Sequence, residues 1–211
     1  MYRLHGFSQS GNAYKVAVLL QALRQPWAAV PLPFADFLAG VPRSDAFRQN
    51  QNVMGEIPIL EAGDRKLTQS GVILTYLAEK HGAYGGRNEA EKLEILRWML
   101  FDNHKFTSYY ATLRFLQGIV KNGDPAVLEF LRGRALGAFG IVDKHLAKQP
   151  FLLGAQPTIA DFSLAGYQYY EEETGIDRND FPHLLAWTRR IAQLPGWKHP
   201  YELMPRGAPG P

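Results

Sequence analysis

The stretch that decides the fold is Gly55-Glu56-Ile57-Pro58-Ile59-Leu60, which is followed after a short gap by Gln69-Ser70-Gly71-Val72-Ile73-Leu74. The apolar run from Ile57 is typical of a short strand. A proline inside that run must lie at a strand start or on an edge, because it cannot donate to a sheet ladder. If the Ile57–Pro58 bond is cis, as an X-Pro bond at a tight entry can be, the N–H and C=O of Ile57 turn out of the sheet. They are then available to pair with an extended peptide.

The second part of the stretch, Gln69-Ser70, is expected to open a helix. The free N–H groups and the positive end of the dipole at a helix start favour a carboxylate. The two parts together predict strand-like pairing for a peptide backbone with an anion site beside it. That combination suits a small acidic peptide.

Strand and helix patterns alternate in the first half of the chain. Apolar residues recur from Ala13 at the spacing of one buried helix face, Asn12 can cap that helix, and Pro26 ends it. The inward side chains are expected to be Leu4 in the first strand and Val72, Ile73, Tyr76 and Leu77 in the last helix. The predicted elements are strands at 2–7 and 27–32, a short helix near 44–50, a hairpin of 57–61 and 66–68, and a helix at 70–80. This order of βαβ followed by ββα predicts a mixed four-stranded sheet covered by helices.

Only helical patterns follow the glycine-rich segment 81–88, which is expected to be a linker. Residues 89–117 form one long helix or a broken pair, with Leu93, Leu96 and Leu100 spaced for burial. A helix opens near Pro125, and its expected inner face is Val127, Phe130, Leu131, Ala135, Ala138, Phe139, Val142 and Leu146. Thr158 and Asp161 have the spacing of a capping box that opens a helix over 159–173. The predicted organisation is therefore a first domain over 1–80, a linker over 81–88 and an all-helical domain over 89–211.

The composition excludes several classes of function. The chain has 211 residues, a formal net charge of +3 and no cysteine, so disulfides, a thiolate nucleophile and cysteine-ligated zinc are ruled out. The six histidines show no metal-ligand spacing, and no basic run indicates nucleic acid. Because the start of the chain lacks a signal-peptide pattern and no apolar run has membrane-spanning length, we expect a cytoplasmic protein that binds neither metal nor membrane.

The motifs resemble those of the glutathione S-transferase superfamily, in its bacterial form with serine and asparagine in the active-site loop. The segment Gly55–Leu60 is similar to the family stretch N-x-x-G-x-V-P-x-L, and Ser8-Gln9-Ser10-Gly11-Asn12 is similar to the active-site loop. The resemblance covers nearly the whole chain. It implies a thioredoxin-like first domain that binds glutathione, followed by a helical-bundle domain.

The resemblance also implies an activity. We expect a homodimeric detoxification enzyme that activates the glutathione thiol and conjugates it to a small hydrophobic electrophile, with residues 89–117 at the dimer interface. Two alternatives remain open. One is a glutathione-dependent disulfide or peroxide reductase, which would use two glutathione molecules because the chain has no cysteine of its own. The other is a non-catalytic binding protein of the same fold.

By resemblance, Ser10 is the residue that activates the thiol, and Ser8 and Asn12 are the alternative donors. A thiol with a pKa of about 8.5 is mostly protonated at neutral pH, whereas the thiolate is the nucleophile. A hydroxyl donor and a helix N-terminus can each favour the thiolate. The alternative for Ser10 and Asn12 is a capping role, which we expect for Asn12.

The resemblance assigns the glutathione-binding residues as well. Ile57, at the bond to Pro58, would pair with the cysteinyl residue, and Ser70 would hold the γ-glutamyl carboxylate. Gln69 is neutral where many members have an acidic residue for the γ-glutamyl ammonium, so Asp102 of a neighbouring subunit is a candidate for that contact. Glu56 replaces a residue that is often basic, which leaves the glycyl carboxylate to Gln51, Arg48 or Lys66.

One face of the 89–117 segment is implied to border the pocket for the second substrate. The residues on that face are Phe106, Tyr109, Tyr110 and Arg114. An aromatic stripe at helical spacing also suits a core, so both interpretations stay open. Asp161 is interpreted as a folding residue that caps its helix.

Overall fold

The computed structural model describes residues 1–170 and 172–204. The chain forms two compact units, one of Met1–Ala83 together with the chain from Leu194, and one of Tyr84–Gln193. The first unit therefore ends close to the expected linker, and it also includes the segment from Leu194 to Met204, which the sequence analysis assigned to the helical domain. The Tyr14 hydroxyl donates to the Lys198 carbonyl at 2.9 Å and ties this segment to the first helix.

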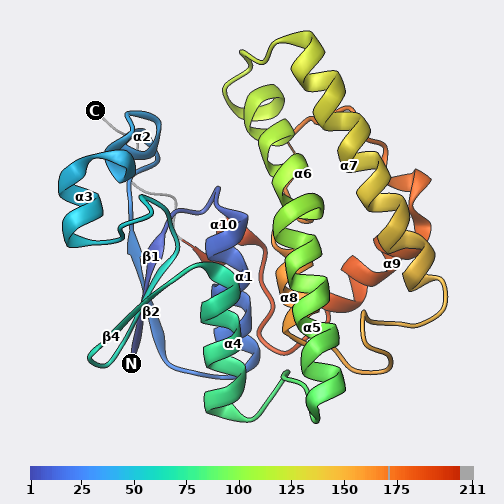
Figure 1. Cartoon of the computed structure of the whole chain (residues 1–211), viewed down its shortest axis with the longest axis horizontal. Coiled ribbons are helices and arrows are strands. Elements are labelled where there is room, and N and C mark those ends of the chain that lie inside the picture. Colours follow the sequence, from blue (N-terminus) through green and yellow to red (C-terminus); the bar gives the residue numbers. More distant parts are fainter. Residues whose placement is uncertain (171, 205–211) are drawn as a thin grey trace. The chain divides into compact units, whose positions relative to one another are not determined.

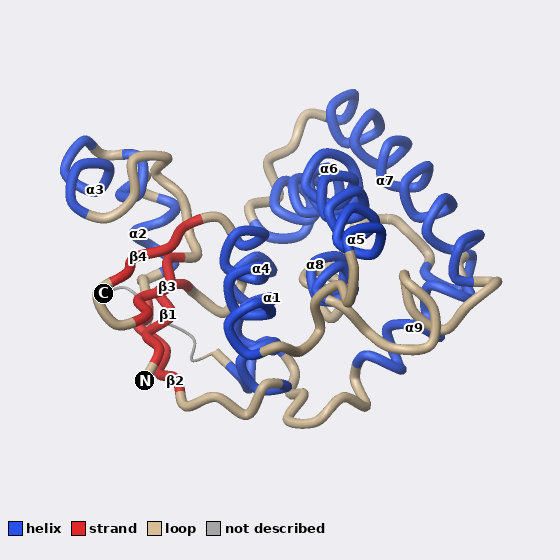
Figure 2. Tube along the Cα trace, turned by 60° about the horizontal axis from the view of Figure 1, so that its bottom comes forward, coloured by secondary structure: helices blue, strands red, loops and turns tan. Residues whose placement is uncertain are grey.

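The first unit contains a mixed four-stranded sheet with the order β2-β1-β3-β4. Strand β1 pairs in parallel with β2, and β3 is antiparallel to both β1 and β4. Helices α1 and α4 lie side by side on one face of this sheet (Figure 2). The elements are β1 (Tyr2–Gly6), α1 (Gly11–Ala22), β2 (Trp27–Pro31), α2 (Phe34–Leu38), the 3₁₀ turn η1 (Val41–Arg43), α3 (Asp45–Asn50), β3 (Ile59–Ala62), β4 (Arg65–Thr68), α4 (Ser70–His81) and α10 (Pro200–Leu203). The predicted thioredoxin-like architecture is confirmed.

Helix α1 begins two residues earlier than predicted, and its cap is a different residue. Ser10 is the N-cap, and its Oγ accepts a hydrogen bond of 3.2 Å from the Ala13 N–H. The expectation that Asn12 caps the helix is wrong, because Asn12 already lies inside the first turn. Almost every position of α1 is buried, as expected for a helix covered on two sides.

Three other details of the first unit differ from the sequence predictions. In α4 the buried residues are Ile73, Leu74, Leu77 and Ala78, and Val72 is 54% exposed. These residues lie three, four, seven and eight positions after Ser70, which is also buried, so all of them share one face of the helix. Strand β3 begins at Ile59, two residues later than expected, and the short helix α2 was not predicted.

The second unit is entirely helical within the described residues, apart from one isolated bridge, and its first helix is long (Figure 1). That helix runs from α5 (Glu89–Phe101) through the π-helical segment η2 (Asp102–Phe106) and α6 (Thr107–Leu113) into the π-helical η3 (Arg114–Ile119), and it packs against α7. The other elements are α7 (Pro125–Leu146), α8 (Ile159–Ala165), the 3₁₀ turn η4 (Arg178–Asp180) and α9 (Pro182–Ile191). The predicted helical domain is confirmed, and none of its described helices is long and apolar enough to cross a bilayer.

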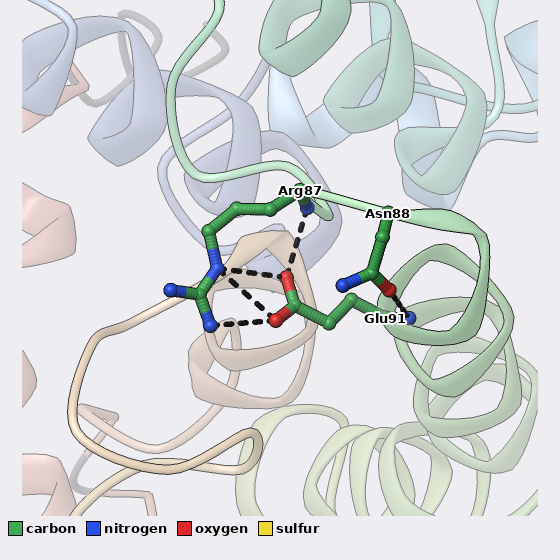
Figure 3. Close-up of polar contacts among 3 residues, drawn as sticks. All are labelled: Arg87, Asn88 and Glu91. Carbon is green, nitrogen blue, oxygen red and sulfur yellow. Dashed lines mark hydrogen bonds and ion pairs between the residues drawn. The ribbon is translucent and has the colours of Figure 1, made fainter.

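The start of α5 is held by a local network of three residues (Figure 3). Asn88 Oδ1 accepts from the Glu91 N–H at 2.9 Å, which satisfies one of the unpaired donors of the first turn. The Glu91 carboxylate accepts from the Arg87 N–H at 2.8 Å and from the Arg87 guanidinium at 2.6 Å. This network fixes where the helix begins.

The predicted inner faces of α5 and of the first turns of α7 are wrong. Leu93, Leu96 and Leu100 are 60%, 51% and 60% exposed, and the core side of α5 is formed by Ile95, Trp98 and Met99. Helix α5 is apolar on two sides, so spacing alone does not decide which side meets the core. Val127 and Phe130 are also exposed, whereas the six other predicted inner residues of α7, from Leu131 onward, are buried.

Asp161 is a structural residue, as predicted. Its fully buried carboxylate accepts from the Thr158 N–H at 2.8 Å, the Leu152 N–H at 2.9 Å and the Trp187 indole at 2.9 Å. Burial raises the pKa of Asp161, and these hydrogen bonds act in the opposite direction. The capping box with Thr158 is present, but α8 ends at Ala165 and not at 173.

Candidate active site

The loop that precedes α1 positions two buried hydroxyl groups. The Ser10 N–H donates to the Phe7 carbonyl at 3.0 Å, which closes a turn and brings Ser10 to the helix start. Ser10 is an acceptor in its cap bond, so its own proton remains available for donation. The Ser8 hydroxyl is buried and donates to Gln9 Oε1 at 3.1 Å, so it is already engaged within the loop.

Asn12 is the second residue of α1 and follows Ser10 by two positions. Its side-chain Oδ1 is buried and has no hydrogen-bond partner among the described residues. A buried acceptor without a partner is uncommon and often marks a place where a ligand completes the bonding. Ser8, Ser10 and Asn12, the three predicted donors, therefore all lie at the N-terminus of α1. Ser8 donates within the loop, Ser10 accepts the cap bond, and the Oδ1 of Asn12 has no partner among the described residues.

The strand entry at Ile57 has the backbone geometry that the sequence analysis required. The Ile57–Pro58 peptide bond is cis, and the β3 ladder begins only at Ile59, opposite His5. Across residues 1–170 and 172–204, neither the N–H nor the C=O of Ile57 forms a backbone hydrogen bond. Pro58 is buried and Ile57 is half-buried. An extended peptide can therefore pair with Ile57 without displacing a bond of the sheet.

Asn52 shapes the loop that leads to Ile57, and the sequence analysis did not single it out. Its side chain is buried, donates to the Glu56 carbonyl at 2.8 Å and accepts from the Met54 N–H at 3.0 Å. Gly55 has φ +68°, and a Cβ there would lie 2.6 Å from the Pro42 carbonyl oxygen, so only glycine fits. An asparagine three residues before a glycine is the signal that would have identified this turn.

Helix α4 presents its first turn beside this loop. The N-cap residue Gln69 has φ +67° and makes no side-chain cap, so the N–H groups of Ser70 and Gly71 find no acceptor in its side chain. Ser70 is only 6% exposed, and its hydroxyl makes no hydrogen bond to any residue in the described part of the chain. The helix start thus offers two kinds of unpaired donor to an anion.

The two residues that depart from the family pattern contact each other. Gln69 Nε2 donates to Glu56 Oε2 at 2.8 Å and also lies 3.0 Å from Met54 Sδ. The sequence analysis treated Glu56 and Gln69 separately, because they are 13 residues apart. The β3–β4 hairpin pairs Ile59 with Thr68 and so brings the two residues together.

The basic residues proposed for the glycyl carboxylate lie near the same loop. Lys66 Nζ donates to Gln51 Oε1 at 3.1 Å and to the Asn50 carbonyl at 3.3 Å. Arg48 Nε donates to the Arg43 carbonyl at 3.2 Å, and its guanidinium lies next to Gly55. Two cationic side chains are therefore available for a carboxylate on this side of the first unit.

The predicted electrophile-pocket residues all lie in the second unit, where most of them are buried. Phe106 and Tyr110 pack on Phe139 with ring centroids 5.0 Å and 5.1 Å apart, and both are core residues. Arg114 is buried and forms a two-pronged ion pair with Glu172, at 2.9 Å and 2.8 Å. Tyr109 is half-buried, and its hydroxyl accepts a hydrogen bond from Arg134 at 3.3 Å, whereas Tyr110 lines a cavity together with Tyr170 and Arg178.

The suggestion that Asp102 reaches a neighbouring subunit is wrong. Asp102 is fully buried in η2, and its carboxylate accepts from the Thr107 hydroxyl at 2.5 Å and the Ser163 hydroxyl at 2.6 Å. It joins η2 to α8 within its own chain. In the described residues, His, Asp and Glu side chains form no group of three that could hold a metal ion.

Comparison with known proteins places the chain in a family. Residues 4–87 match the model of the glutathione S-transferase N-terminal domain, and residues 125–190 match that of the C-terminal domain. Glutathione S-transferase F14 of Arabidopsis thaliana is 30% identical over 79% of this chain and 70% of its own length. Glutathione S-transferase verG of Clonostachys rogersoniana is 34% identical, but the match spans 60% of this chain and only 57% of the relative.

Solved structures agree with these matches. The crystal structure of a glutathione S-transferase from Pseudomonas fluorescens superimposes with a TM-score of 0.83 and 30% identity, covering 93% of this chain and 97% of that one. The chain belongs to the glutathione S-transferase family. The resemblance stated from its motifs is thereby confirmed.

Proposed function

We propose that this protein is a glutathione transferase, which binds glutathione on the first unit and adds its thiolate to a small hydrophobic electrophile. The observation that carries the proposal is the unpaired backbone of Ile57 beside the start of α4. The cysteinyl residue of glutathione pairs with the Ile57 N–H and C=O in the manner of an added strand. The γ-glutamyl carboxylate accepts from Ser70 and the first N–H groups of α4.

Ser10 is the proposed activator of the thiol. Its hydroxyl keeps a proton to donate, and it stands at the N-terminus of α1, where the helix dipole adds a positive field. Each unit by which the thiol pKa falls requires about 1.4 kcal/mol of preferential thiolate stabilisation. Asn12 and Ser8 are the alternative donors, and the unpartnered Oδ1 of Asn12 keeps it within the proposed site.

The chemistry of the proposed reaction is a nucleophilic displacement or addition. The thiolate sulfur donates its electron pair to the electrophilic carbon and forms the C–S bond, and a leaving group such as chloride departs with its own pair. A bound thiol attacks faster than a free one for two reasons. Its lower pKa increases the fraction present as thiolate, and its fixed position restricts the geometry of attack.

We also propose that the protein is a cytoplasmic homodimer with a role in detoxification. The leucine face of α5, defined as Leu93, Leu96 and Leu100, is exposed in the single chain. A row of exposed leucines on one helix marks an interaction surface. The absence of cysteine fits a reducing compartment.

The test combines a binding and an activity measurement on wild-type protein and Ser10→Ala. We expect glutathione to raise Tm, the thiol pKa in the complex to lie below that of free glutathione, and a chloro-nitro aromatic to be conjugated. Ser10→Ala should raise the bound thiol pKa and lower kcat/KM by about 10- to 100-fold. Reduction of a small disulfide, with two glutathione molecules oxidised to their own disulfide and little conjugation, would instead identify a reductase. The absence of any Tm shift would identify a protein that does not bind glutathione.

A further inference from the structure

The second unit holds a cavity of about 520 Å³. Small organic ligands occupy pockets of this size in proteins. Tyr110 of α6 forms one part of its wall, residues 168–170 and 172–174 after α8 form another, and α9 supplies Thr188 and Arg189. Of the described residues in this wall, only Tyr110 was assigned to a binding site by the sequence analysis, so the rest of the cavity has no assigned role.

Tyrosine rings form much of the wall. Tyr110 and Tyr170 are almost fully buried, at 2% and 4% exposed, and Tyr169 is half-buried. The Tyr110 hydroxyl accepts from Arg178 Nη2 at 2.6 Å, and the Tyr169 hydroxyl donates to the Thr188 carbonyl at 2.9 Å. Because these two hydroxyls are already bonded within the protein, the rings are the parts that remain for contact with a ligand. Such rings favour a planar aromatic group.

Three charged side chains of the wall are already bonded within the helical unit. The Glu172 carboxylate accepts from the buried Arg114 guanidinium at 2.9 Å and 2.8 Å. Glu173 Oε1 accepts from the Gly175 N–H at 2.5 Å. The guanidinium of Arg178 is held by the tyrosine hydroxyl described above. These groups therefore stabilise the wall of the cavity.

Arg189 on α9 differs from these three side chains. It is exposed at the cavity and forms neither a hydrogen bond nor an ion pair with any residue of 1–170 and 172–204. Its neighbour Arg190 donates to the Pro150 carbonyl at 2.9 Å and does not line the cavity. A guanidinium presents parallel N–H donors that match the two oxygens of a carboxylate. Arg189 therefore supplies a cation that no acidic side chain in the described part of the chain neutralises.

We propose that this cavity binds a planar aromatic carboxylate, with its ring system against the tyrosine rings and its carboxylate on Arg189. Each part of the wall selects one part of the ligand. An aliphatic acid would lose the contact with the rings, and a neutral aromatic molecule would leave the Arg189 guanidinium without a partner. The site lies within the helical unit and is independent of the proposed reaction of glutathione.

The experiment compares two ligands by calorimetry, 2-naphthoate and the neutral 2-naphthamide. Wild-type protein should bind one 2-naphthoate per chain. Arg189→Gln should bind 2-naphthoate about 5- to 10-fold more weakly, because a charged hydrogen bond at an exposed site is lost. Its affinity for 2-naphthamide should equal that of wild-type protein. The matched control is Arg190→Gln, which removes the adjacent guanidinium outside the cavity and should change neither affinity.

A second variant, Ala192→Trp, places a large side chain in the cavity, since Ala192 is half-buried in its wall. It should abolish binding of both ligands, and the Tm of the protein without ligand checks that the fold is kept. Absence of 2-naphthoate binding to wild-type protein, or equal losses in Arg189→Gln and Arg190→Gln, would overturn the inference. Binding that persists in Ala192→Trp would place the ligand elsewhere on the protein and would overturn it as well.

Discussion

The indole Nε1 of Trp187 donates a hydrogen bond of 2.9 Å to the carboxylate of Asp161, and both side chains are fully buried. The same carboxylate joins Leu152 and Thr158, so three segments of the helical unit meet at one side chain. Removal of the carboxylate leaves several buried donors without an acceptor. The core of the second unit therefore depends on a polar residue.

Asp161→Ala should lower the free energy of unfolding by about 2–4 kcal/mol, because buried donors lose their partner. Urea denaturation at neutral pH measures this loss. The matched control is Asp124→Ala, which removes the exposed aspartate cap of α7 and should cost about 1 kcal/mol. Equal losses in the two variants would show that Asp161 acts only as a local cap.

Ser10→Ala should lower stability by about 1 kcal/mol, independently of any catalytic role, because the Ala13 N–H loses its acceptor. Ser10→Thr should restore most of that stability, since threonine also caps helices. Urea denaturation of both variants without glutathione checks this. An unchanged free energy of unfolding in Ser10→Ala would mean that the cap does not contribute to stability. A change in the thiol pKa of the same variant would then reflect only the contact between Ser10 and the thiol.

Ser70→Ala should weaken glutathione binding by about 5- to 30-fold while changing the unfolding free energy by less than about 0.5 kcal/mol. Within residues 1–170 and 172–204 the hydroxyl caps no helix, so its loss should remove only a donor to the bound carboxylate. Calorimetry gives the affinity, and the Tm of the protein without glutathione gives the stability. A large fall in Tm without ligand would contradict the assignment of Ser70 to binding.

His81 should make the first unit less stable at mildly acidic pH. Burial, with a smaller contribution from the charge of Lys80, lowers the pKa of His81 from its ordinary value of 6.5, and its Nε2 lies 2.9 Å from the Tyr2 hydroxyl. Below that ordinary value the unfolded chain takes up a proton that the folded chain resists, so stability is full above about pH 6.5 and falls as the pH decreases towards and through the folded pKa.

His81→Gln removes this proton uptake. The unfolding free energy of the variant should therefore fall less than that of wild-type protein between about pH 7.5 and pH 5. Denaturation curves at both pH values measure the difference. Parallel pH profiles for the two proteins would exclude His81 as a source of acid sensitivity.

Leu96→Glu should shift the proposed dimer towards monomer, because it places a charge in the middle of the leucine face of α5. Sedimentation velocity should show at least a tenfold weaker association. Ile141→Glu is the control, since Ile141 is also about half exposed but lies on α7. A dimer unaffected by Leu96→Glu would exclude this face as the interface.

Local patterns determined the elements of the fold. A proline after Ile57 predicted a strand entry with a free backbone, although the strand itself begins at Ile59, and Ser70 marked a helix start in both the sequence and the structure. The spacing of Thr158 and Asp161 identified a capping box. These features depend on a few consecutive residues whose backbone preferences do not change with distant packing.

Tertiary packing decided what the local patterns left open. Helices α4 and α5 carry apolar residues on more than one side, so only the neighbouring elements determined that Ile73 and Trp98 face inward while Val72 and Leu96 do not. The contact of Glu56 with Gln69 exists because a hairpin joins them, and Asp102 is buried because α8 supplies Ser163. A side chain's exposure and partners are set by segments far away in the sequence, and no local spacing encodes them.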